Sequence, residues 1–165
     1  MPKVLVAYAT VYGSTQGVAE AIAETFRTQE LEADVLPAGD VRSLDGYSAV
    51  VLGTAMYFFL LRPEAKRFLA RNRAAIAGGV PIALFALGPF TTKPEELEAA
   101  RKPVDKLLES SSWLKPVSVR IFGGQHQPEK LRFPHTMMRT TPASDARDWD
   151  DIRAWALELA EAFKR

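Results

Sequence analysis

Two spacings of hydrophobic positions alternate along the chain. Short apolar runs of strand length, rich in β-branched and aromatic residues, occupy residues 4–8, 33–36, 49–52, 82–87 and 117–122. Between several of these runs, apolar residues recur at the spacing of a helix with one buried face. The pattern predicts five strands that are separated mostly by helices.

Four helices are expected from this spacing. The first covers residues 15–29, where Val18, Ile22 and Phe26 share one face. The others are expected from Pro63 to residues 78–79, from residue 94 or 95 to about residue 109 with a kink at Pro103, and from residue 144 or 145 onward. The link over residues 37–46 is too short for us to expect a helix there.

Strands and helices in alternation predict a parallel sheet, because a crossover between parallel strands needs a dozen or more residues and covers the sheet as it returns. We therefore expect one doubly wound α/β domain over residues 1–165, with helices on both faces. Ligands of such sheets bind beyond the carboxyl ends of the strands. The loops that follow the strands are where a functional site is expected.

Composition narrows the classes of function. The chain has 165 residues, 47% hydrophobic and 25% charged, as in an ordinary globular domain. The absence of cysteine excludes disulfides, thiolate metal sites and thiol catalysis. Lys and Arg number 21 against 20 Asp and Glu, a balance that does not favour a nucleic-acid partner. We expect no transmembrane segment, no signal peptide and a cytoplasmic location.

The segment after the first expected strand collects groups that bind anions. Backbone N–H groups and three hydroxyls meet there at the start of a helix, in the run Thr10, Val11, Tyr12, Gly13, Ser14 and Thr15. The run lacks the lysine of a nucleoside-triphosphate loop and the glycine pattern of a dinucleotide loop. Its neutral donors suit one terminal phosphate monoester. The alternative is that Ser14 or Thr15 only caps the helix.

Two further loops carry aromatic side chains at the same edge of the expected sheet. They follow the third and fourth strands, and they comprise Thr54, Ala55, Met56, Tyr57 and Phe58, and Leu87, Gly88, Pro89, Phe90 and Thr91. Flat side chains such as Tyr57 and Phe90 can stack on a planar ligand, and Gly88 lets the backbone approach one. Alternatively, these aromatic residues belong to the core.

Residues 8–15, followed by Ala19, resemble the FMN-phosphate signature of the flavodoxin family. The resemblance implies a five-stranded sheet of order 2-1-3-4-5, with FMN at the ends of the first, third and fourth strands. The phosphate would lie on residues 10–15 and the ring between the two aromatic loops. Gly123 and Gly124, after the last strand, would border the substrate side.

Most of the chain resembles one branch of this family, the flavodoxin-domain proteins related to menaquinone-dependent protoporphyrinogen oxidase. The matching segments are residues 53–69, 112–113, 122–124 and 148–149. Two features depart from that branch. Phe59 stands near the reactive edge of the flavin, where the branch often has glycine. The segment between the last strand and the last helix is only residues 125–144, whereas the oxidase has a long basic and aromatic insertion there.

The segment of residues 125–144 has two interpretations. It is a lid or docking surface for an electron partner, in which apolar and basic side chains meet an apolar substrate, carboxylates or anionic lipid at a membrane periphery. Alternatively, it is a solvated loop that covers the edge of the sheet. Its two histidines lack the spacing of metal ligands, so no metal site is expected.

The leading hypothesis is therefore an FMN-binding oxidoreductase or electron carrier, in which no side chain is assigned a catalytic role. A redox partner protein or a quinone would exchange electrons with it, while a small-molecule substrate and the oligomeric state stay open. One alternative is a quinone-dependent dehydrogenase resembling protoporphyrinogen oxidase. The other is a non-catalytic interaction module with the flavodoxin fold.

Overall fold

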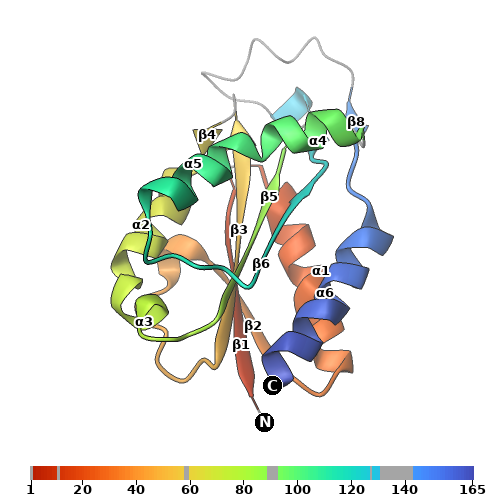
Figure 1. The fold of residues 1–165 in the computed structure, drawn as a ribbon. Helices are drawn as coiled ribbons and strands as arrows, with labels where there is room; N and C mark the ends of the chain where they lie inside the picture. The colour runs from red at the N-terminus through yellow and green to blue at the C-terminus, as the bar shows by residue number, and fades with distance from the viewer. Residues whose placement is uncertain (1, 11, 58–59, 89–92, 127, 131–142) are drawn as a thin grey trace.

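A computed structural model of the protein describes all residues except 1, 11, 58–59, 89–92, 127 and 131–142. Five parallel strands form its centre in the order β2-β1-β3-β5-β6 (Figure 1). They are β1 (Lys3–Ala9), β2 (Glu32–Pro37), β3 (Ala49–Tyr57), β5 (Ile82–Leu87) and β6 (Ser118–Phe122). Counted along the chain, these strands have the order 2-1-3-4-5, so the expected topology is confirmed.

Helices cover both faces of the sheet, as expected for a doubly wound fold (Figure 1). One face packs against α1 (Ser14–Thr28) and α6 (Trp149–Lys164). The other packs against α2 (Pro63–Arg71), α3 (Arg73–Ala77) and α5 (Lys102–Ser110), and α4 (Pro94–Ala100) lies beside β6. No helix in the described part has the length and apolar character needed to cross a membrane.

Short elements that the spacing did not predict complete the fold. β4 (Leu60–Leu61) pairs antiparallel with the end of β3, and β7 (Gln125–His126) pairs with β8 (Ser144–Asp145). Single turns of 3-10 helix form η1 (Ala38–Asp40) and η2 (Pro128–Lys130). A two-residue strand is too short to show a period, so its pairing could not be anticipated from hydrophobic spacing.

Two helix boundaries differ from expectation, and one expected kink is confirmed. The helix that begins at Pro63 is interrupted at Asn72, whose buried side-chain amide donates a hydrogen bond to the Phe68 carbonyl at 2.9 Å. The expected kink is confirmed at Arg101, because Pro103 lies in the first turn of the next helix. The last helix begins later than expected, at Trp149, because residues 144–145 form β8 and Asp148 caps the helix.

The apolar runs are continuous because both faces of the sheet are buried. Along β1, Val4 and Val6 face the layer of α1 and α6, whereas Leu5 and Ala7 face the opposite layer. In the first layer, the buried Trp155 ring lies edge-on to two phenylalanine rings, and its indole N–H donates a hydrogen bond to Ser118 Oγ at 2.8 Å. The two helix layers cover the faces of the sheet, so a functional site is expected at the carboxyl ends of the strands.

A polar cluster joins β1 and β2 to the turn before β3. The Tyr47 hydroxyl donates to Asp34 Oδ2 at 2.6 Å, and Lys3 Nζ lies 2.9 Å from the same oxygen. Burial, together with the hydrogen bond to the Asp34 carboxylate, raises the pKa of Tyr47 to about 12. The Tyr47 and Lys3 hydrogen bonds lower the pKa of Asp34.

This cluster predicts a stability change at alkaline pH. An unfolded tyrosine has a pKa of about 10, so the neutral phenol stabilises the fold below that pH, and its contribution is lost as the pH rises through about 12. Tyr47→Phe should remove the last phase of tyrosine ionisation in an absorbance titration. The stability advantage of wild type over Y47F should also shrink between pH 10 and 12. An unchanged last phase in Y47F would contradict the assignment.

Candidate functional site

The carboxyl ends of the central strands lie side by side at one edge of the sheet, at the top of Figure 1. Thr54 of β3 is in register with Ala9 of β1 and with Ala86 of β5. Leu87 of β5 is in turn paired with Phe122 of β6. The segments that follow these four strands therefore start from neighbouring points, which brings the predicted loops to one place.

The loop of residues 10–15 leads directly into α1. The helix begins at Ser14, and its N-cap residue is Gly13, which has a left-handed φ of 92° and no side-chain cap. A glycine is favoured here because most residues with a Cβ adopt this conformation at a cost. The Gly13 N–H donates a hydrogen bond to Thr10 Oγ1 at 3.1 Å, which closes the loop.

This geometry bears on the capping interpretation of the loop. Ser14 and Thr15 lie inside the first turn of α1 instead of at its cap, so the interpretation that they only cap the helix is wrong. Among the residues that the structure describes, no side chain caps the start of the helix. Helix N-termini carry a partial positive charge and N–H groups without intrahelical partners, and both favour an anion.

Thr15 provides an independent indication of a ligand. Its side chain is fully buried, and its Oγ1 makes no hydrogen bond within the described part of the chain. An unsatisfied buried hydroxyl costs about 1–3 kcal/mol and is uncommon in folded proteins. Ser14 beside it is also buried. The chain therefore places one unsatisfied hydroxyl in the first turn of an uncapped helix, where an acceptor from outside the chain would satisfy it.

Arg147 is a residue of this site that the sequence did not reveal. Its Nη1 donates to the Ser14 carbonyl at 3.3 Å, across 133 positions of sequence. The side chain is only 12% exposed, and its guanidinium lies 4.8 Å from the centre of the Trp149 ring. A Cβ on Gly17 would lie 3.1 Å from Nη1, so the glycine leaves room for the guanidinium.

Asp145 fixes the orientation of Arg147. Two of the guanidinium nitrogens, Nε and Nη2, donate to the two carboxylate oxygens at 2.9 and 2.7 Å. This hydrogen bonding lowers the pKa of Asp145. Bidentate pairing holds the planar guanidinium in one orientation. The pair therefore brings a fixed cation against the first turn of α1, and no short motif in the sequence signals that contact.

Several of the residues expected to surround a ring have buried side chains at the strand ends. The side chains of Ala55 and Leu87 are buried, so only their backbone groups lie at the edge. The Thr54 hydroxyl accepts a hydrogen bond from the Arg62 N–H at 3.1 Å, which ties β3 to the start of α2. Both faces of the sheet are covered by helices, so side chains stay buried up to the last residues of these strands.

Gly88 is explained by packing against the protein itself. A Cβ at this position would lie 3.0 Å from Met56 Cε and 3.0 Å from Ala100 Cβ, so these two side chains occupy the space beside it. The backbone of Tyr57 ends β3. Its side chain lies outside the described residues, as do Val11, Phe58, Pro89, Phe90 and Thr91. Stacking of aromatic residues on a ring therefore stays a prediction.

Gly123 and Gly124 connect the edge of the sheet to the Arg147 segment. Both are buried, and the Gly124 carbonyl accepts a hydrogen bond from the Ala146 N–H at 2.9 Å. That bond, together with the pairing of β7 and β8, directs residues 144–148 back toward α1. The glycine pair thereby positions the segment that carries Arg147.

Comparisons with known proteins agree with this arrangement. The model of a family described as "Flavodoxin domain" matches residues 5–150. An archaeal flavodoxin superposes with a TM-score of 0.63 at 18% identity over 99% of both chains. Flavodoxin 1 of Bacillus cereus gives 0.59 at 19% over 96% of this chain and 97% of its own. Rubredoxin:oxygen oxidoreductase of Desulfovibrio gigas gives 0.59 at 16%, over 98% of this chain and 36% of its own. The fold, the carboxyl-edge loop and the family match together show that the chain belongs to the flavodoxin domain family.

Proposed function

We propose that the protein is an FMN-binding electron-transfer flavoprotein that holds the FMN phosphate on residues 10–15. The observation that carries the proposal is the buried Thr15 hydroxyl, which has no partner within the described part of the chain and lies in the first turn of an uncapped helix. The family match and the flavodoxins of similar fold support the choice of flavin.

The donors around Thr15 fit a phosphate monoester. They are hydroxyls and the N–H groups at the start of α1, with one guanidinium held behind them by Asp145. A dianion gains from the helix dipole and from the N–H groups at the start of α1, and the Arg147 guanidinium offsets the charge of the nearby Asp145 carboxylate. When bound, FMN supplies the ring that carries electrons, and the chain supplies binding and the surroundings that tune it.

Binding of FMN and riboflavin to the purified protein tests the proposal, because the two ligands differ only in the phosphate. We expect quenching of flavin fluorescence by the protein, with FMN bound at least about tenfold more tightly than riboflavin, since charge-assisted hydrogen bonds contribute about 1.5–3 kcal/mol. A protein that binds neither ligand would contradict the proposal and favour the non-catalytic interaction module.

Arg147→Gln should weaken FMN binding about five- to tenfold and leave riboflavin binding within about twofold. The reason is that removing the positive charge raises the electrostatic energy of the phosphate, which riboflavin lacks. Arg153→Gln is the matched control, since Arg153 is 57% exposed and pairs with Asp150 on the outer side of α6. Titration of both variants by fluorescence quenching measures the difference. Equal losses of binding affinity for FMN and riboflavin in R147Q would show that Arg147 stabilises the fold and does not act on the phosphate.

A narrower proposal places the protein with the quinone-dependent dehydrogenases that resemble protoporphyrinogen oxidase. It is supported by the resemblance of residues 53–69, 112–113, 122–124 and 148–149 to that branch. The FMN-loaded protein would then form protoporphyrin from protoporphyrinogen with a quinone as acceptor, measured by porphyrin fluorescence. Absence of turnover by protein that has bound FMN would exclude this branch and leave the electron carrier.

A further inference from the structure

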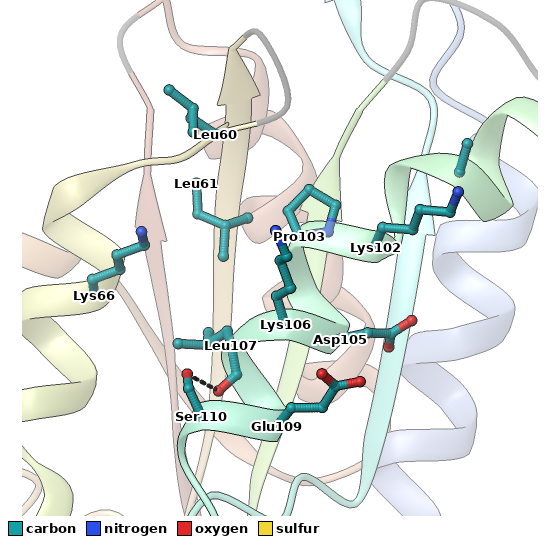
Figure 2. A pocket seen from close by; sticks show the side chains of 11 residues that line it. Leu60, Leu61, Lys66, Lys102, Pro103, Asp105, Lys106, Leu107, Glu109 and Ser110 are labelled. Atoms are coloured by element: carbon teal, nitrogen blue, oxygen red, sulfur yellow. Dashed lines mark hydrogen bonds between the residues drawn. The ribbon is translucent and has the colours of Figure 1, made fainter.

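An open hollow of about 1020 Å³ lies between β4, α2 and α5 (Figure 2). Its apolar lining includes Leu60, Leu61, Pro103 and Leu107. Leu60 is 67% exposed, although burial of a leucine side chain is favourable. The hollow therefore presents apolar surface that an apolar ligand would cover.

The wall beneath the hollow is formed mainly by apolar side chains. A gap of about 20 Å³ adjoins it, and Leu61, Lys66 and Leu107 line both spaces. The other side of the gap is formed mainly by buried side chains of the sheet, among them Leu84 and Phe85. An apolar gap of this size has room for about one water molecule and offers it few hydrogen-bond partners. The floor of the hollow is therefore apolar.

Positive charge gathers at the apolar part of the hollow. Lys66 of α2 and Lys106 of α5 extend toward Leu61 from opposite sides (Figure 2). Neither ammonium group has an ion-pair partner among the residues that the structure describes. The carboxylates of Asp105 and Glu109 point away from Leu61 (Figure 2), and Asp105 pairs with Arg101 at 3.2 Å. Two like charges across an apolar surface favour an anion between them.

We propose that this hollow binds one molecule of a single-chain aliphatic carboxylate. The hydrocarbon chain lies on Leu60, Leu61 and Leu107, and the carboxylate lies between Lys66 and Lys106. The concave shape favours a single ligand molecule over a flat membrane surface, which would reach only the rim. The volume is at the upper end of the range of small-molecule pockets, about 300–1000 Å³. The site shares no residue with the FMN-phosphate loop, so the two proposals stand independently.

Calorimetric titration with decanoate, below its micelle concentration, and with decan-1-ol tests the proposal on the full chain. We expect wild type to bind decanoate at least about tenfold more tightly than the alcohol. The double variant K66Q/K106Q should lose that preference while still binding the alcohol. Lys115→Gln, which removes an exposed lysine outside the hollow, is the control and should keep the preference. Leu60→Ser should weaken the binding of both decanoate and decan-1-ol.

Three results would overturn the proposal. Equal affinity of wild type for decanoate and decan-1-ol would exclude recognition of the carboxylate. An equal loss of decanoate binding in K115Q and in K66Q/K106Q would indicate unspecific attraction by net charge. Binding to vesicles of anionic phospholipid without any binding of monomeric decanoate would identify the hollow as part of a membrane-facing surface. Thermal melts of each variant show that the fold is retained.

Discussion

Thr15→Val is expected to change flavin affinity and stability in opposite directions. The variant should bind FMN about 10- to 100-fold more weakly, because it loses a hydrogen bond of about 1.5–3 kcal/mol to a charged phosphate. Without ligand it should unfold about 2–4 °C higher, because valine removes a buried hydroxyl that has no partner in the described part of the chain. Fluorescence titration and thermal melts measure the two effects.

The opposite signs distinguish a binding residue from a structural one. Thr15→Ser keeps the hydroxyl and should retain most of the FMN affinity. Thr25→Val is the matched control in the same helix, because the Thr25 hydroxyl already donates to the Ala21 carbonyl at 3.0 Å. It should leave FMN affinity unchanged. If T15V binds FMN as tightly as wild type, Thr15 does not contact the phosphate.

Gly53→Ala is expected to destabilise the fold by about 3 kcal/mol, near the upper end of typical overpacking costs. A Cβ at Gly53 would overlap the ring of Phe85. The ring has little freedom to move, because it is 1% exposed and lies between Trp155 and Phe122, with ring centres 6.1 Å from each. Denaturant unfolding of wild type and variant measures the change.

A double variant identifies the cause. In Gly53→Ala combined with Phe85→Leu, the smaller side chain leaves space for the new methyl group. We expect the pair to be less destabilised than the sum of the single changes by about 1–2 kcal/mol. Gly39→Ala is the control, because a Cβ there meets nothing within 4 Å, and its effect should stay within about 0.5 kcal/mol. If the losses of unfolding free energy in the two single variants simply add in the double variant, the overlap between the Gly53 position and Phe85 is refuted.

The five strands of the central sheet were predictable because they are short apolar runs separated mostly by helical spacing. Their order 2-1-3-4-5 came from the resemblance of residues 8–15 to a known phosphate loop, not from hydrophobic spacing. β4, β7 and β8 were not predictable, since two residues cannot display a period. Because the five strands are parallel, their carboxyl ends lie at the same edge of the sheet.

The candidate site was predictable only in part. The loop of residues 10–15 combines several hydroxyls with one glycine before a helix, and this local pattern is visible in the sequence. The contribution of Arg147 was not predictable from the sequence, because its contact with Ser14 spans 133 positions. The burial of Ala55 and Leu87 depends on where each strand ends, because both faces of the sheet are covered up to that point. Hydrophobic spacing locates those boundaries poorly.

The pairing of β7 with β8 has a consequence for engineering this fold. The ladder joins Gln125 to Asp145 and His126 to Ser144, so the two chain ends that bound residues 127–143 are held together at its base. The entropy of closing a loop grows slowly with its length, so a segment inserted between these ends adds little cost. This two-stranded ladder is therefore an attachment point at which a foreign recognition element can be grafted close to the loop of residues 10–15 while Arg147 keeps its place.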